Sequence, residues 1–339
     1  MKTLTLHEPG RWIATDKPEP GGPAPGEVLV CVHRIGICGT DIHAYHGTHP
    51  LFTYPRVPGH ELGVEVVRVG QGVSNLTPGD RCAVEPYMTC GKCPACRAGK
   101  TNCCETLQCL GVHVDGGMRE YIVVPADKLH PSRQLGYEAL ALVETLGIGR
   151  HAVERARVAP GECVAVIGLG PIGLTVATFA KLAGARVVGI DVSEQRIAAA
   201  RTLLGVETLR LDPSGSIQSQ WTTGFGDRPA AVFDATGNRA SMQNAFDLPG
   251  HGGRLIMVGL VIGDLTFDDP AFHRKELTLL ASRNATADDF RAIIGQIEAN
   301  KIDTAAWITH TCQVEALPAE LDAWLTPGAG LLKGMCRFD

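Results

Sequence analysis

The chain has 339 residues, which is enough for two domains with sizeable cores. It holds 31 basic and 36 acidic residues, a formal net charge of −5, and no basic run that would offer a footprint for a phosphate backbone, so nucleic acid is not expected as a partner. The first residues lack the apolar core of a signal peptide, and no apolar run is long enough to span a membrane. We therefore expect a cytoplasmic protein.

Residues 1–145 are predicted to form a β-rich domain. Turn-forming Pro and Gly residues separate short apolar runs, and this pattern favours strands. Strands are expected at 27–35, 61–69, 81–84 and 121–124. The spacing of apolar residues becomes helical from Tyr137 to Val153.

A second domain is predicted over residues 146–281, because strands and helices alternate there. This alternation is typical of a parallel, doubly wound α/β sheet. Its strands are expected at 163–167, 186–190, 230–236, 253–259 and 277–281, with helices at 174–184 and 193–204. Residues 282–339 add a helix at 288–299, a helical segment at 314–325 and a last strand near 334–338.

The first strand of this second domain, Cys163–Ile167, leads into glycines with GxGxxG spacing. Gly168 suits a tight turn, Gly170 allows a pyrophosphate to approach the backbone, and Gly173 lets the next helix pack closely on the strand. The helix would direct its N-terminal N–H groups at that pyrophosphate. This order of strand, glycine turn, helix, strand and acid predicts a dinucleotide site.

Asp191 is the acid of this pattern and lies 23 residues after Gly168. A carboxylate at this place accepts hydrogen bonds from the adenosine ribose. It would also repel a 2′-phosphate, so the sequence favours NAD over NADP.

Seven of the 12 cysteines cluster between residues 82 and 109. Four of them have the spacing C-x2-C-x2-C-x7-C, at Cys90, Cys93, Cys96 and Cys104. Four thiolates in a compact loop suit a closed tetrahedral zinc site of structural type. Spacing alone does not exclude an iron–sulfur cluster. Cys103 adjoins Cys104 and is the alternative fourth ligand.

A second group of metal-binding residue types is scattered along the first domain. Cys38-Gly-Thr40-Asp41-Ile-His43 is followed by Gly59-His60-Glu61 and, much later, by Glu144. Taken singly, each of these residues is more simply interpreted as a structural or solvated side chain.

In their order, these motifs give the sequence a resemblance to the zinc-containing medium-chain alcohol and polyol dehydrogenases. The resemblance covers essentially the whole chain. It implies a GroES-like catalytic domain built from both ends of the chain, with a Rossmann domain inserted and the active site in the cleft between them. It also implies a zinc ion that acts as a Lewis acid on a substrate hydroxyl, and hydride transfer to NAD.

By this resemblance, the catalytic zinc is held by Cys38 and His60, and the carboxylates of Glu61 and Glu144 complete its coordination. Liver-type alcohol dehydrogenases have cysteine where Glu144 stands, so the carboxylate points to the sorbitol-dehydrogenase-like branch. Thr40 and His43 would relay the released proton, and Asp41 would orient a ligand. Two departures from the family pattern are Val64, where glycine is usual, and Thr145, where many relatives have proline.

The resemblance also assigns cofactor and substrate contacts. Arg196 and Lys333 would reach the adenine ribose and the pyrophosphate, although either cation is equally well interpreted as solvated surface charge. The other expected cofactor contacts are Pro171, Ile172, Thr236, Gly237, Val258, Gly259, Leu260, Ser282, Arg283 and Asn284. Polar substrate contacts are expected from His43, His46, Tyr54, His113, Arg283 and Asn284.

The stretches 110–117 and 282–286 most resemble bacterial sugar-acid dehydrogenases that oxidise L-galactonate or L-gulonate at C5. A polyol such as sorbitol, xylitol or galactitol is the competing substrate class, and L-threonine is more distant. A non-catalytic NAD-binding protein and a zinc-lobe interaction module are the alternatives from other classes. Relatives form dimers or tetramers, and residues 253–260 are expected to pair sheet edges between subunits of a homo-oligomer.

Overall fold

The computed structural model describes residues 1–338; residue 339, the end of the predicted C-terminal segment, lies outside them. The chain divides into two compact units. The first unit contains residues 1–145 and resumes at Ala285, three residues later than the boundary predicted at 282, and the second unit contains Leu146–Asn284. None of the helices in the described chain is long and apolar enough to cross a membrane.

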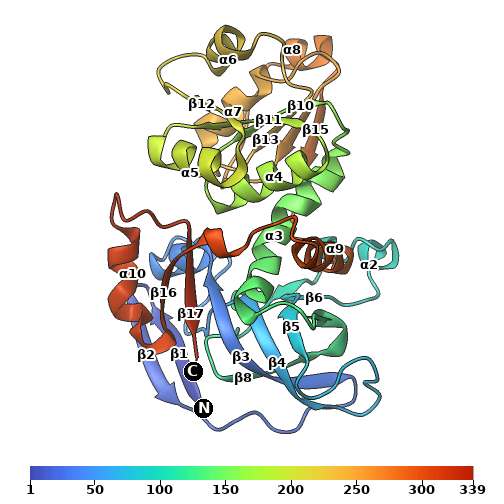
Figure 1. The fold of residues 1–339 in the computed structure, drawn as a ribbon, viewed down its shortest axis with the longest axis vertical. Helices are drawn as coiled ribbons and strands as arrows, with labels where there is room; N and C mark the ends of the chain where they lie inside the picture. Colours follow the sequence, from blue (N-terminus) through green and yellow to red (C-terminus); the bar gives the residue numbers. More distant parts are fainter. Residues whose placement is uncertain (339) are drawn as a thin grey trace. The chain divides into compact units, whose positions relative to one another are not determined.

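The core of the first unit is a seven-stranded sheet in the order β16-β17-β3-β4-β5-β9, with β8 also paired to β3. Two of its strands come from residues 121–131 and two from residues beyond 300, so distant segments of the chain lie side by side (Figure 1). The strands are β3 (Glu27–Ile37), β4 (Glu61–Val69), β5 (Arg81–Val84), β8 (Tyr121–Pro125), β9 (Leu129–Pro131), β16 (Ile308–Gln313) and β17 (Lys333–Arg337).

Helices and small sheets complete the first unit. Apolar side chains from the large sheet and from the C-terminal helix form its core, including Val30, Leu62 and Trp324. The helices are α1 (Gly39–Tyr45), α2 (Pro94–Arg97), α9 (Ala287–Glu298) and α10 (Leu317–Leu325). The small sheets pair β1 (Lys2–Glu8) with β2 (Arg11–Asp16), and β6 (Tyr87–Met88) with β7 (Gln108–Cys109).

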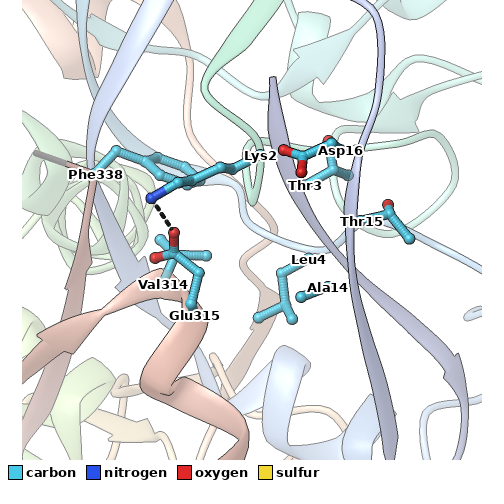
Figure 2. Close-up of a pocket in the computed structure, with 9 residues that line it drawn as sticks. All are labelled: Lys2, Thr3, Leu4, Ala14, Thr15, Asp16, Val314, Glu315 and Phe338. Carbon is cyan, nitrogen blue, oxygen red and sulfur yellow. Dashed lines mark ion pairs between the residues drawn. The ribbon is translucent and has the colours of Figure 1, made fainter.

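The N-terminal hairpin β1–β2 borders a pocket of about 250 Å³ together with Val314, Glu315 and Phe338 (Figure 2). Lys2 and Glu315 form an ion pair of 2.6 Å between exposed side chains at this pocket. None of the residues predicted to act in catalysis, metal binding or cofactor binding lines it.

The second unit is the predicted doubly wound sheet. Its six parallel strands have the order β12-β11-β10-β13-β14-β15, in which the direction of winding reverses between β10 and β13. The strands are β10 (Cys163–Ile167), β11 (Arg186–Asp191), β12 (Glu207–Arg210), β13 (Ala231–Asp234), β14 (Arg254–Met257) and β15 (Thr278–Ala281). The helices are α4 (Pro171–Leu182), α5 (Glu194–Leu204), α6 (Ile217–Phe225), α7 (Arg239–Asn244) and α8 (Asp269–Arg274); α3 (Tyr137–Ala156) runs from the first unit into the second.

One expectation about this sheet is wrong. Residues 253–260 were expected to offer a sheet edge to another subunit, but β14 pairs with β13 on one side and with β15 on the other. A strand whose N–H and C=O groups are paired on both sides has no free edge. The edges of the six-stranded sheet are β12 and β15.

The departure at Val64 has a local explanation. Val64 is fully buried in β4, and the residue before it, Gly63, lies so close to α3 that an added Cβ would be 2.1 Å from the carbonyl oxygen of Tyr137. The glycine needed for close packing of this strand is therefore present one position earlier than in the family pattern.

Candidate active site and metal centres

Cys38 joins β3 to α1 and forms the N-cap of that short helix. Its backbone N–H donates to Oδ2 of Asp41 at 2.9 Å, so the loop that carries the thiol is held by a buried carboxylate. The other oxygen of Asp41, Oδ1, lies 4.0 Å from Nδ1 of His60. Asp41 thus lies beside Cys38 and His60, but it is not one of the residues whose potential metal-ligand atoms are grouped together.

The side chains of Cys38, His60 and Glu61, which we call the Cys38 site, converge at the adjacent ends of β3 and β4. Their potential ligand atoms all lie within 4.8 Å of one another. The turn before His60 requires glycine, because Gly59 has a φ of +96°. On β3, an added Cβ at Gly36 would come within 1.9 Å of Glu61 Oε2, so this glycine makes room for the carboxylate.

The chemistry of the Cys38 site fits a divalent cation. His60 and Glu61 are buried, and neither His60 Nδ1 nor Asp41 Oδ1 has a hydrogen-bond partner among the described residues. Burial lowers the pKa of His60, but the neighbouring Cys38 thiol and Asp41 carboxyl outweigh it and raise that pKa well above its usual value. A buried set of thiol, imidazole and carboxylate groups that attracts positive charge is the ligand set of zinc enzymes.

Lys333 lies inside this site. Its side chain is 2% exposed, and Nζ donates to both carboxylate oxygens of Glu61 at 2.7 and 2.8 Å and to the carbonyl oxygen of Ile37 at 3.3 Å. The interpretation of Lys333 as solvated surface charge is therefore wrong. The β17–β3 pairing that creates this contact was not foreseen from the sequence.

Glu144 lies on α3 and is buried, but it is not grouped with the Cys38 site. The hydroxyl of Tyr87 donates to Glu144 Oε1 at 2.5 Å. Burial raises the pKa of Glu144, the charge of His60 lowers it, and the charge of Glu61 raises it further, which places the carboxylate within electrostatic range of both residues. Tyr87 was missed by sequence reasoning, and its position directly after Pro86 carries no motif that could have identified it.

Two further predicted catalytic residues, Thr40 and His43, lie on α1. Thr40 Oγ1 is 3.6 Å from Cys38 Sγ, and the exposed His43 has Nδ1 3.0 Å from Thr48 Oγ1. His113 Nδ1 accepts from the backbone N–H of Cys109 at 3.0 Å. The structure also brings in His49, which was not predicted. Burial lowers its pKa, as do the charges of three further histidines, His43, His113 and His60.

His46 and Tyr54, two further predicted substrate contacts, are not members of the Cys38 site. His46 is exposed at the end of α1, and the Tyr54 hydroxyl donates to the carbonyl oxygen of Ala44.

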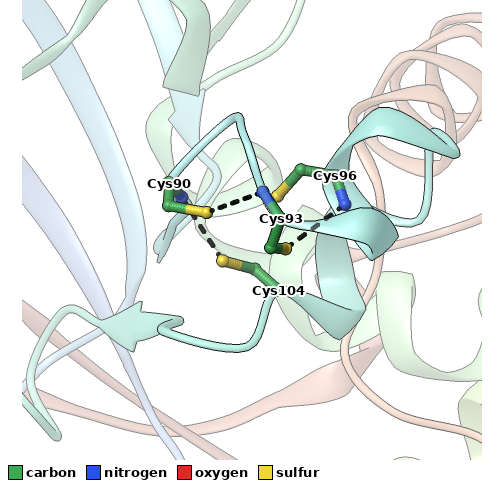
Figure 3. A group of neighbouring side chains, drawn as sticks. All are labelled: Cys90, Cys93, Cys96 and Cys104. Carbon is green, nitrogen blue, oxygen red and sulfur yellow. Dashed lines mark hydrogen bonds between the residues drawn. The ribbon is translucent and has the colours of Figure 1, made fainter.

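The four-cysteine lobe, formed by Cys90, Cys93, Cys96 and Cys104, brings its sulfur atoms together (Figure 3). Backbone N–H groups donate to three of the sulfur atoms. The N–H of Cys90 donates to Cys104 Sγ at 3.3 Å, that of Cys93 to Cys90 Sγ at 3.3 Å, and that of Cys96 to Cys93 Sγ at 3.5 Å. Cys104, and not the exposed Cys103, belongs to the group.

The electrostatics of the lobe also fit a cation. Hydrogen bonds from the backbone of Lys92 and Cys93 lower the pKa of Cys90 to about 6. Burial and the neighbouring thiols raise the pKa of Cys96 to about 12. Once one of these crowded thiols is ionised, its negative charge disfavours ionisation of a second. A divalent cation at their centre would instead favour the thiolate form of all four.

The glycine turn of the second unit borders a cavity of about 500 Å³. Gly168 has a φ of +87°, which requires glycine, and an added Cβ at Gly173 would come within 1.7 Å of the Gly168 carbonyl oxygen. Gly170 lines the cavity, and an added Cβ there would have no neighbour within 4 Å. The first glycine is therefore needed for its positive φ and the third for close packing, whereas the second leaves open space at the N-terminus of α4.

Asp191 ends β11 at this cavity and is held by backbone groups. Its Oδ2 accepts from the N–H of Leu169 at 2.7 Å and its Oδ1 from the N–H of Ser193 at 2.8 Å. Arg196, 3.7 Å from the carboxylate, also lines the cavity. The other predicted cofactor residues that line it are Pro171, Ile172 and Thr236.

Several predicted cofactor residues lie outside this cavity lining, namely Gly173, Gly237, Val258, Gly259, Leu260, Ser282, Arg283, Asn284 and Lys333. Gly259 packs against Gly237, because a Cβ added at Gly259 would be 2.4 Å from the backbone nitrogen of Gly237. The Ser282 hydroxyl is buried without a hydrogen-bond partner among residues 1–338, and Asn284 has a φ of +54°. Sequence reasoning missed Asn238, Ser241 and Asn244, polar residues on or beside α7 that line the cavity.

Comparison with known proteins agrees with this arrangement. Residues 24–134 match the alcohol dehydrogenase GroES-like domain, and residues 171–299 match the zinc-binding dehydrogenase family. The solved structure of rspB from E. coli CFT073, complexed with NADH, superimposes with a TM-score of 0.92 at 29% identity and covers 100% of this chain and 99% of that chain. The GroES-like and Rossmann fold predicted from the sequence is confirmed.

Characterised relatives are similar over nearly the full length. L-Galactonate-5-dehydrogenase of Escherichia coli is 42% identical over 342 residues, covering 100% of this chain and 99% of the relative. Sorbitol dehydrogenase of Halalkalibacterium halodurans is 30% identical over 320 residues, covering 91% of this chain and 92% of the relative. With two groups of metal-binding side chains and a dinucleotide-type glycine turn in place, these similarities show that the chain is an oxidoreductase and belongs to the zinc-containing medium-chain alcohol and polyol dehydrogenase family.

Proposed function

We propose that this chain oxidises the secondary alcohol at C5 of a sugar acid of the L-galactonate or L-gulonate type, with NAD as the hydride acceptor. The single observation that carries the reaction class is the convergence of Cys38, His60 and Glu61 in a buried site. The substrate class is supported by the 42% identity to L-galactonate-5-dehydrogenase and by 35% identity over 292 residues to 2-dehydro-3-deoxy-L-galactonate 5-dehydrogenase of Pseudoalteromonas atlantica.

In this proposal Cys38, His60, Glu61 and Glu144 hold a catalytic zinc, and the four-cysteine lobe holds a second, structural zinc. The catalytic ion would supply Lewis acidity that lowers the pKa of a substrate hydroxyl. The Thr40 hydroxyl, next to the Cys38 thiol, relays the released proton by accepting it and donating its own proton onward. The exposed imidazole of His43 passes it to solvent, because one ring nitrogen can accept a proton while the other releases one.

Substrate binding is assigned to His43, His113, Arg283 and Asn284. Cationic and hydrogen-bonding side chains of this kind suit a substrate that carries both hydroxyls and a carboxylate. NAD is proposed to bind along Gly168, Gly170 and Gly173, with its adenosine ribose on Asp191. We further propose that the protein works as a homo-oligomer on this small-molecule substrate.

A substrate panel tests the proposal. Reduction of NAD and of NADP is followed by the absorbance of the reduced nicotinamide, with L-galactonate, L-gulonate, sorbitol, xylitol and galactitol as substrates. Galactitol and sorbitol are the matched polyols, because they carry a CH2OH group where L-galactonate and L-gulonate carry the terminal carboxylate. Xylitol is one carbon shorter and tests chain length as well. We expect the highest kcat/KM with a sugar acid and NAD, and a ketone at C5 in the product.

Other outcomes decide between the remaining functions. Faster turnover of the polyols would make the chain a polyol dehydrogenase, a class represented among the relatives by sorbitol dehydrogenase. Reduction of NADP alone would contradict the role given to Asp191. Failure to reduce either dinucleotide with any substrate, despite bound zinc, would leave a non-catalytic NAD-binding protein.

Replacing Asp191 by asparagine should lower kcat/KM for NAD about 10- to 100-fold and raise the relative use of NADP. The change keeps the shape of the side chain but removes a charged acceptor, and a hydrogen bond to a charged group contributes about 1.5–3 kcal/mol. Initial rates with both cofactors measure the effect. Glu194→Gln, an exposed acid on α5, is the matched change in charge and should leave the preference intact.

Replacing Tyr87 by phenylalanine should weaken zinc binding at the Cys38 site about 10- to 100-fold, since groups that orient metal ligands have effects of this size. The change removes the hydrogen bond that positions Glu144. Zinc retention against a competing chelator measures the effect without relying on turnover. Tyr137→Phe is the control, because Tyr137 makes an equally short bond of 2.5 Å to Glu65. Equal zinc retention in both variants would contradict the role of Tyr87.

A further inference from the structure

The last two strands of the seven-stranded sheet, β16 and β17, bring together two cysteines that belong to neither metal-binding group. Cys312 on β16 and Cys336 on β17 are direct partners in the parallel register of these strands, which adjoin in the ribbon (Figure 1). Directly paired residues project from the same face of a sheet. Their sulfur atoms lie 3.6 Å apart, and both side chains are free thiols.

The two thiols have different surroundings. Cys336 is fully buried in the core beside β3, whereas Cys312 is partly exposed on β16, which is an edge strand of the sheet. The hydrogen bond from Cys336 lowers the pKa of the Cys312 thiol, and the shared bond together with burial raises the pKa of Cys336. Cys312 is therefore the more reactive of the two, because the thiolate form is the nucleophile.

We propose that Cys312 and Cys336 are a redox modification site, at which a peroxide converts the two thiols into a reversible intrachain disulfide. The Cys312 thiolate attacks one peroxide oxygen, the O–O bond breaks, and the sulfur becomes a sulfenic acid while the other oxygen leaves as water. The Cys336 sulfur then attacks Cys312 Sγ, the S–O bond breaks, and the thiol proton leaves with the hydroxide as a second water. Two thiols are oxidised and one peroxide is reduced to two waters.

The backbone permits this bond. Neighbouring strands lie about 4.8 Å apart, which falls within the range of Cα separations spanned by disulfides, about 4.4–6.8 Å. The sulfur atoms must close from 3.6 Å to a bond of about 2.05 Å. The bond would fasten β17 to β16 three residues after Lys333, the residue whose ammonium group holds Glu61.

Peptide mapping of the full-length, zinc-loaded protein tests the proposal. The protein is treated with a small excess of hydrogen peroxide, free thiols are blocked with N-ethylmaleimide, and the digest is examined by mass spectrometry without reduction. We expect a linked pair of peptides carrying Cys312 and Cys336, which disappears when a thiol reductant is added before blocking. Recovery of both cysteines as maleimide adducts, under conditions that oxidise other cysteines of the chain, would overturn the proposal.

Variants establish the order of the two steps. In Cys336→Ser the second thiol is missing, so dimedone should trap a sulfenic acid at Cys312, whereas Cys312→Ser should give no such adduct at Cys336. Cys31→Ser is the matched control, since Cys31 is another partly exposed thiol of the same sheet, and it should leave the linked peptides unchanged. A dimedone adduct on Cys336 in place of Cys312 would contradict the assignment of the attacking thiol.

Discussion

Cys38→Ser should reduce kcat for alcohol oxidation by at least about 1000-fold. A metal that acts as a Lewis acid contributes several kcal/mol to the stabilisation of the transition state, and each 1.36 kcal/mol corresponds to a factor of ten in rate. Cys38 offers the only thiol among the three side chains of the Cys38 site, and a serine hydroxyl is a poor replacement for a thiolate ligand. Initial rates with NAD and a saturating alcohol substrate measure the effect.

Two accompanying measurements separate the loss of metal from the loss of fold. Zinc content should fall by one ion per chain, because the four-cysteine lobe is untouched, and NAD binding measured by fluorescence should persist. Cys31→Ser is the control, since Cys31 lies on the same strand, β3, but outside the metal-binding group. Full turnover by a Cys38→Ser protein with one zinc fewer would refute the proposed mechanism.

Glu85→Gln should destabilise the first unit by about 3–5 kcal/mol, the typical cost of breaking a buried ion pair. Glu85 is 1% exposed, and its carboxylate accepts from Lys128 Nζ at 2.6 Å and lies 3.2 Å from His130 Nε2. The substitution keeps the volume but leaves the buried Lys128 ammonium without a charged partner. Denaturant unfolding followed by tryptophan fluorescence measures the change.

A double variant and a surface variant sharpen this test. Glu85→Gln combined with Lys128→Met removes both charges, so much of the lost stability should return. Glu315→Gln breaks the exposed ion pair with Lys2 and should shift the unfolding curve little, because exposed pairs are screened by solvent. Equal losses of unfolding free energy in Glu85→Gln and Glu315→Gln would contradict the prediction that the buried ion pair stabilises the protein more than the exposed one.

Much of the fold was predictable from local patterns. The strand, glycine turn and helix around Gly168 lie where their residues predict them, because positive φ at Gly168 and the crowded position of Gly173 are demands that neighbouring residues create. Alternation of strands and helices likewise predicted the parallel sheet. The same reasoning placed β14 at an edge incorrectly, since the order of strands depends on how every crossover packs and not on any one segment.

In the candidate site, too, some residues were predicted from the sequence and others were found only in the structure. The spacing of the four-cysteine lobe was sufficient to predict a metal site, whereas Cys38, His60 and Glu61 were assigned to a metal only through the family resemblance. The groups that hold the site's carboxylates were not identified in this way. Tyr87 bonds Glu144 across 57 residues, and Lys333 bonds Glu61 across 272 residues.

The sequence by itself thus determined which chemistry this protein carries, because thiols, imidazoles, carboxylates and glycines at set spacings are local properties of the chain. Only the tertiary structure decided which partners surround them. The pairing of β17 with β3, and of β3 with β4, places Lys333 against Glu61, and the pairing of β16 with β17 places Cys312 against Cys336. Such contacts arise when distant strands share one sheet, and no pattern within either segment records which strand will lie beside it.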